Sequence, residues 1–119
     1  EVRMEALVQG EMPCVMHVVV AGGGREYLAC LLTLVCDPTG VHLVGPALHF
    51  AQASGSTATT VDDARKCGAF RRGLLTGFAT CNKLVCEAGR RAGIRARPAQ
   101  LRRFTILSKQ FCLEDGTLE

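Results

Sequence analysis

The stretch CVMHVVVAGGGREYLACLLTLVC, residues 14–36, decides the fold of this 119-residue chain. Its two halves, Cys14–Ala21 and Tyr27–Cys36, are almost wholly apolar and rich in Val and Leu, which predicts two strands buried on both faces. The glycine-rich link between them is short, so we expect an antiparallel hairpin. Phosphate-binding glycine loops open a helix, whereas these glycines lead into a strand, which favours a hairpin turn.

Turn and helix signals follow the hairpin. In Asp37–Gly40, Pro suits the first corner of a turn and Gly its last position. Pro46 and Gly55 suit the first position of a helix and the residue just past its end. The segment 56–60 then offers several N-cap residues ahead of two acids.

A long amphipathic helix is predicted from Cys67 onward, because apolar residues recur there every three or four positions. They are Phe70, Leu74, Phe78, Cys81, Val85, Ala88 and Ala92. Pro98 disfavours any helix beyond Arg97, and Phe104–Ser108 reads as a third strand. At the start of the chain, Glu1–Gln9 predicts one or two helical turns ended by Gly10.

These elements predict an α+β domain in the order α-β-β-α-α-β, with a small three-stranded mixed sheet covered by helices. A chain of 119 residues suits one domain. Only six residues are aromatic and none is Trp, so aliphatic side chains are expected to fill the core.

Seven cysteines are present, but neither Cys30/Cys36 nor Cys81/Cys86 has the CxxC spacing of a zinc site. We expect buried, reduced thiols in an intracellular protein. The three histidines share no ligand spacing, and no catalytic constellation is readable. No stretch approaches the ~20 apolar residues of a membrane span. The predictions are therefore no metal, no transmembrane segment, and a cytoplasmic or peripherally membrane-associated location.

The net charge is only +3, but the arginines are clustered. Six of them lie within fourteen residues that contain no acid: Arg90, Arg91, Arg95, Arg97, Arg102 and Arg103. Guanidinium groups bind the phosphates of nucleotides, coenzymes and nucleic acids. Arginines at a helix C-terminus are also favoured by the helix dipole without any ligand. Both interpretations stay open from the residues alone.

Three stretches, in order along the chain, resemble the C-terminal domain of adenylate-forming acyl-CoA synthetases, and most closely the bubblegum-type long-chain fatty acid–CoA ligases. They are MPCVMHVVVAGGGREYLACLLTL (12–34), SGSTATTV (54–61) and AQLRRFTILSKQFCLEDGTLE (99–119). The first resembles the family's hairpin, with Gly23 in place of its acid. The last resembles a strand that enters an acidic turn before a loop with a catalytic lysine.

The resemblance implies that residues 1–119 form the mobile C-terminal lid domain of a parent ligase, truncated after Asp115-Gly116 and before that lysine. In the family, ATP with Mg²⁺ and a fatty acid form an acyl-adenylate, and CoA then displaces AMP. The implied partners are the parent's N-terminal domain, a long-chain fatty acid and CoA, with no nucleic acid. The isolated chain is expected to be inactive.

The resemblance also implies a cofactor-binding role for Arg90, Arg91 and, more weakly, Arg25, as contacts to the phosphates of CoA. No catalytic residue is assigned. The alternative function is a small intracellular binding module that uses its Arg-rich segment for nucleic acid or an acidic partner.

Overall fold

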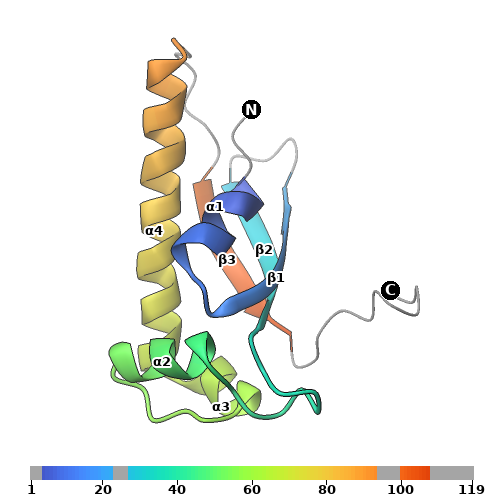
Figure 1. The fold of residues 1–119 in the computed structure, drawn as a ribbon. Helices are drawn as coiled ribbons and strands as arrows, with labels where there is room; N and C mark the ends of the chain where they lie inside the picture. Colours follow the sequence, from blue (N-terminus) through green and yellow to red (C-terminus); the bar gives the residue numbers. More distant parts are fainter. Residues whose placement is uncertain (1–3, 23–26, 94–99, 108–119) are drawn as a thin grey trace, which may run out of the picture.

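The computed structural model describes residues 4–22, 27–93 and 100–107 (Figure 1). Within them the elements are α1 (Met4–Glu11), β1 (Val15–Ala21), β2 (Tyr27–Leu34), α2 (Pro46–Ala53), α3 (Val61–Lys66), α4 (Gly68–Arg91) and β3 (Gln100–Ile106). The predicted order is confirmed, with the second helical segment before β3 divided at Cys67 into α3 and α4.

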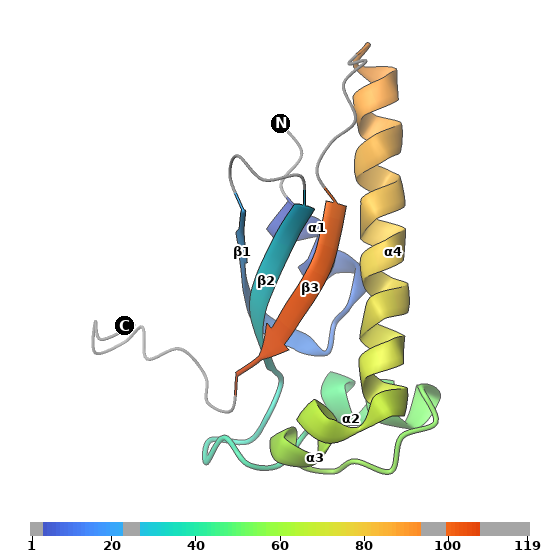
Figure 2. The same ribbon diagram turned by 180° about the vertical axis from the view of Figure 1, so that it is seen from behind.

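The strands described form one mixed sheet in the order β1-β2-β3. β1 and β2 pair as the predicted antiparallel hairpin, and β3 pairs with β2 in parallel. A parallel pair needs a long crossover, which α2, α3 and α4 supply. α4 runs the length of the sheet in the opposite direction to β3 (Figure 2). The predicted α+β class is confirmed.

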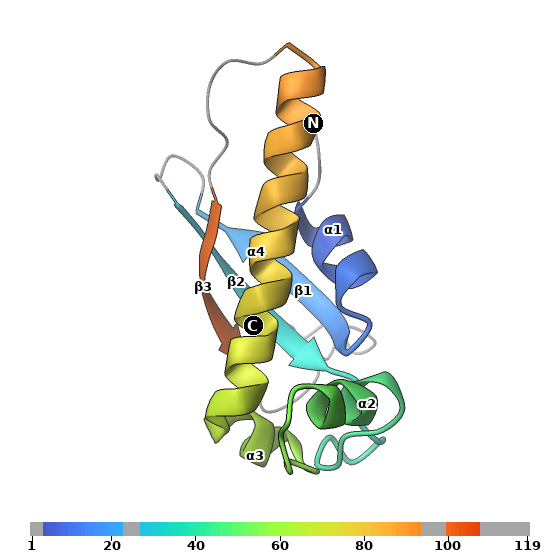
Figure 3. The same cartoon turned by 90° about the vertical axis from the view of Figure 1, so that its left-hand side faces the viewer.

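The strands are not buried on both faces along their whole length, as predicted, but only at the end of β2, where Leu32, Thr33 and Leu34 in succession are at most 1 % exposed. α1 and α4 contact each other and pack on the same face of the sheet (Figure 3). On the opposite face, the side chains of Val19 and Leu31 are 40 % and 44 % exposed. Runs of aliphatic residues therefore do not by themselves reveal whether helices cover one face or two. β2 also ends at Leu34, two residues earlier than expected.

β3 begins at Gln100, four residues before the predicted start at Phe104, and the predicted end at Ser108 lies outside the described residues. The register shifts between Leu28 and Ala29, which pair with Leu101 and Arg103, so Arg102 is an extra residue in β3. Such a bulge allows a basic pair inside an edge strand. Leu101 meanwhile is only 5 % exposed.

The first helix continues through Gly10 and ends at Glu11, ahead of Pro13, so the expected stop at Gly10 is also wrong. The N–H of Met12 still donates to the carbonyl of Val8, at 2.9 Å. This hydrogen bond positions Met12 at the end of the helix, and the side chain of Met12 lies in the core, only 1 % exposed.

The predicted apolar stripe of α4 faces the sheet, and its first four members are its fully buried residues: Phe70, Leu74, Phe78 and Cys81. Phe70 also stacks edge-on against Phe50 of α2, with ring centroids 5.1 Å apart. The turn at Asp37–Gly40 is confirmed by the N–H of Gly40, which donates to the carbonyl of Asp37 at 2.9 Å. Thr60 is confirmed as an N-cap, because its hydroxyl oxygen accepts from the N–H of Asp63.

Candidate functional site

Arg90 and Arg91 lie in the last turn of α4 and are both exposed. This turn lies at the end of the molecule where β1 ends and where β2 and β3 begin (Figure 1). Among the described residues neither side chain has an acidic partner. The carbonyl end of a helix carries partial negative charge. An anion at this place would therefore be held by the guanidinium groups and not by the backbone.

The structure describes four of the six arginines of the predicted cluster, and they lie on two different elements. Arg102 and Arg103 lie inside β3, and both are exposed. Arg25, Arg95 and Arg97 lie outside the described residues. The described arginines of the cluster thus form two pairs on different elements, one at the end of a helix and one within a strand.

Two polar residues of α4, Arg71 and Asn82, contact β3. The sequence analysis did not single out either of them. The guanidinium carbon of Arg71 lies 4.6 Å from the centre of the Phe104 ring, and its Nη1 donates to the carbonyl of Arg65 at 3.2 Å. The amide of Asn82 binds the backbone of Leu101 through two hydrogen bonds, of 2.8 and 3.1 Å. Their only sequence signal is a polar residue beside the apolar stripe, which is common on any amphipathic helix.

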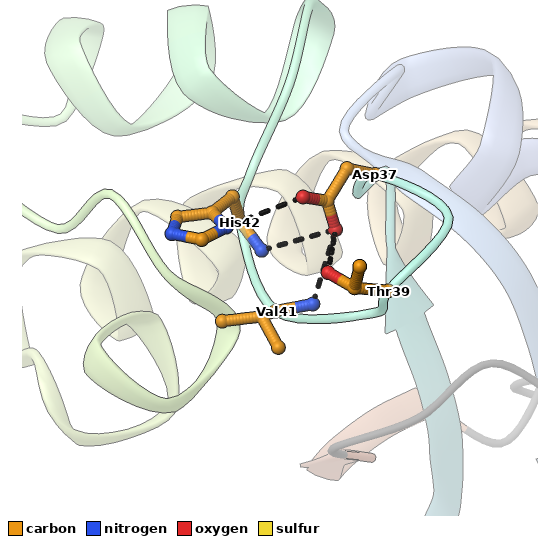
Figure 4. Close-up of polar contacts among 4 residues, drawn as sticks. All are labelled: Asp37, Thr39, Val41 and His42. Carbon is orange, nitrogen blue, oxygen red and sulfur yellow. Dashed lines mark hydrogen bonds and ion pairs between the residues drawn. The ribbon is translucent and has the colours of Figure 1, made fainter.

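A second polar cluster lies in the loop that follows β2 (Figure 4). Oδ1 of Asp37 accepts from the hydroxyl of Thr39 at 2.6 Å and from the N–H groups of Val41 and His42 at 3.2 and 3.3 Å. Nδ1 of His42 lies 3.2 Å from Oδ2. The bond from Thr39, assisted by the two backbone donors, lowers the pKa of Asp37 to about 2.

This cluster does not make a catalytic triad. His42 is 63 % exposed, and the hydroxyl of Thr39 donates to Asp37 instead of to the imidazole. A groove of about 680 Å³ lies between this loop and the start of α3. Its lining residues are Thr39, Gly40, Val41, Thr60, Val61, Asp62, Asp63 and Lys66. Carboxylates and an ammonium group line it together, so it offers no uniform positive charge to a phosphate.

Among the described cysteines, Cys14, Cys30 and Cys81 are buried, and Cys36, Cys67 and Cys86 are partly exposed. Cys112 lies outside the described residues. Burial raises the pKa of Cys14 and of Cys30 to about 12, as expected for inert core thiols. Cys67 differs, because a hydrogen bond with the Ser56 hydroxyl, at 3.1 Å, lowers its pKa. In residues 4–22, 27–93 and 100–107, no three His, Cys, Asp or Glu side chains are grouped as metal ligands would be.

None of the helices described is both long enough and apolar enough to cross a bilayer. The predicted cytoplasmic or peripheral location stays a prediction.

Comparison with known proteins finds relatives over nearly the whole chain. It is 30 % identical over 126 residues to the long-chain-fatty-acid–CoA ligase ACSBG1 of Bos taurus, a match that covers 98 % of this chain and 16 % of that protein. ACSBG1 of Homo sapiens is also 30 % identical, over 125 residues. ACSBG2 of Rattus norvegicus is 26 % identical over 125 residues, which cover 17 % of its length.

No family model matches the chain, and no solved structure matches it. The chain spans about one sixth of the length of the relatives named above. It is therefore related, over almost all of its own length, to one segment of the long-chain-fatty-acid–CoA ligases.

Proposed function

We propose that this chain is the mobile C-terminal lid domain of an ATP-dependent long-chain fatty acid–CoA ligase. The observation that carries the proposal is the match of 98 % of the chain to one segment of two kinds of such ligases. The fold supports it, since a small α+β unit with its own core can move as a body. The parent would join ATP, with Mg²⁺, to a fatty acid and then transfer the acyl group to CoA.

The described residues fit a supporting role better than a central one. Among them, no three His, Cys, Asp or Glu side chains are grouped as metal ligands would be, and the proposal assigns ATP and Mg²⁺ to the larger part of the parent. A swinging lid serves such chemistry by excluding water from the acyl-adenylate, which water would hydrolyse.

CoA carries a 3′-phosphate and a pyrophosphate, which suit guanidinium donors. Arg90 and Arg91 fit these groups, because both are exposed and neither is paired with an acid in the described residues. The proposal gives them the task of holding a CoA phosphate during thioester formation. Arg25 is a weaker third contact, on the grounds of its sequence position alone.

The test replaces Arg90 and Arg91 by Ala in a full-length ligase that carries this segment, and measures the two half-reactions separately. The apparent KM for CoA should rise while adenylate formation is spared. Arg72→Ala is the matched control, because Arg72 is an exposed arginine near the other end of α4. If only stability falls, by the ~0.3–1 kcal/mol of a helix-dipole contact, the arginines are structural.

The 119-residue polypeptide alone is expected to form neither acyl-adenylate nor acyl-CoA. Pyrophosphate release with ATP, Mg²⁺ and palmitate should stay at background. Turnover by this polypeptide would overturn the lid proposal itself, whereas a failed arginine test would overturn only the CoA contacts.

The alternative function, an arginine-based binding module, receives less support from the structure. A nucleic-acid groove would need a continuous basic surface with aromatic side chains for base stacking. Phe104, the aromatic residue nearest in sequence to Arg102 and Arg103, instead packs against Phe78, with ring centroids 5.3 Å apart. Sub-micromolar binding of single-stranded DNA or RNA at physiological salt would revive this alternative.

A further inference from the structure

At both edges of the sheet, side chains of helices form hydrogen bonds with the strand backbone. β1 and β3 are the edge strands, with β2 between them. An edge strand presents unpaired N–H and C=O groups, which are a template for pairing with another strand. In this protein, α1 lies beside β1 and α4 lies beside β3 (Figures 2 and 3), and each helix supplies hydrogen bonds to the edge strand next to it.

At β3, one side chain acts like a neighbouring strand. Oδ1 of Asn82 accepts from the N–H of Leu101 at 2.8 Å, and Nδ2 donates to the carbonyl of the same residue at 3.1 Å. A residue on an adjacent antiparallel strand would exchange the same two bonds with Leu101. The amide of Asn82 thus occupies a place that a second strand would need.

At β1, two side chains share this task. Oε2 of Glu5 accepts from the N–H of Val20, and Nε2 of Gln9 donates to the carbonyl of Met16, both at 2.9 Å. Glu5 and Gln9 are four residues apart and share one side of α1. Met16 is the extra residue at the register shift between Val15 and His17, and its carbonyl accepts from Gln9 and not from β2.

We propose that the side chains of Asn82, Glu5 and Gln9 act as edge caps: they bind backbone groups of the two edge strands. In this way they keep the sheet from pairing with the sheet of a second copy. β3 is the more vulnerable edge, because a single side chain satisfies both backbone groups of Leu101. Without that side chain, both groups need another partner. The β3 edge of a second copy supplies one, in an antiparallel pair about a twofold axis.

A purely structural role for Asn82 makes a different prediction. If its two bonds only tie α4 to β3, then their loss lowers stability and leaves the association state alone. The two interpretations are separated by comparing Asn82→Ala with a variant of similar stability loss that leaves the β3 edge capped. Val85→Ala is that control, because Val85 packs against the core from the next turn of α4.

The experiment is sedimentation velocity of the wild-type, N82A and V85A chains over the same concentration series. N82A should shift toward a dimer at concentrations where the wild type and V85A do not. Amide hydrogen exchange of β3 in N82A should slow as the concentration rises, because a new strand pair protects those amides. A sedimentation profile of N82A that matches that of the wild type would overturn the proposal. Dimerisation of N82A and V85A to the same extent would also overturn it.

Should N82A not fold, the double variant Glu5→Ala/Gln9→Ala makes the same test at β1. The Gln9 bond is exposed and the Glu5 bond only partly buried, so this change spares the core. Association of the double variant supports edge capping, and an unchanged sedimentation profile contradicts it.

Discussion

The two faces of the sheet are built from the same kinds of aliphatic residue but are held in different ways. On the face toward α1 and α4, Leu32 of β2 is fully buried, and Leu74 and Phe70 of α4 lie in the same core. On the other face Leu31, the residue just before Leu32 in the same strand, is 44 % exposed. Close packing makes the first face sensitive to every methylene group, whereas the exposed positions of the second face, Val19 and Leu31, should tolerate change.

Leu74→Ala is the substitution expected to have the largest effect. Leu74 is fully buried, and such truncations cost about 2–5 kcal/mol because they lose apolar burial and leave a cavity. Leu75→Ala is the matched control, since Leu75 is 47 % exposed and should change by less than ~0.5 kcal/mol. Urea unfolding of both variants measures the difference, and similar midpoints would contradict the assigned helix face.

Gly77→Ala tests how tightly α4 is packed. A Cβ at this position would collide with Sδ of Met12, and Met12 is too buried to move aside. Overpacking of this kind costs about 1–3 kcal/mol, which opposes the helix-propensity gain of up to ~1 kcal/mol.

Gly89→Ala provides the comparison on the same helix, because nothing lies within 4 Å of a Cβ there. That variant should be more stable than the wild type, and Gly77→Ala less stable. A gain in melting temperature for both would show that Met12 can yield.

Asp37, which lies in the loop after β2 and not on the packed face, should contribute to the stability of the folded protein in a pH-dependent way. Its pKa is lowered to about 2 in the folded protein, below the value of about 3.9 for an unfolded chain. A lowered pKa adds stability above the unfolded value, and this is lost as the pH falls from about 4 toward 2. Wild type should therefore exceed Asp37→Asn in stability at pH 6, with a gap that shrinks over that range. A gap independent of pH would argue against an ionised carboxylate in this loop.

Leu31→Thr is expected to have the smallest effect, within ~0.5 kcal/mol, because Leu31 is 44 % exposed and Thr suits a strand. Leu32→Thr is its control one residue further along β2, where the side chain is fully buried. Equal losses from the two substitutions would mean that the open face is also covered in solution.

The candidate site was only partly predictable. The position of Arg90 and Arg91 at the exposed end of a long helix follows from the spacing of the apolar stripe and from the glycines around them. The placement of Arg102 and Arg103 within a strand does not, because a basic pair in an edge strand needs a bulge that only the register of β2 and β3 defines. The turn that begins at Asp37 was predicted from the sequence. The hydrogen bonds of Asp37 with the N–H groups of Val41 and His42 were not, because they depend on how the loop closes.

The sequence by itself determined the local elements. Apolar runs on either side of a glycine link specify the hairpin, and a stripe at intervals of three and four specifies α4, since both follow from backbone geometry within a few residues. Only the tertiary structure decided which face of the sheet is covered, where β3 begins, and that Asn82 reaches Leu101. Those outcomes depend on contacts between residues far apart in the chain, such as the 19 positions that separate Asn82 from Leu101, and no local pattern encodes such a distance.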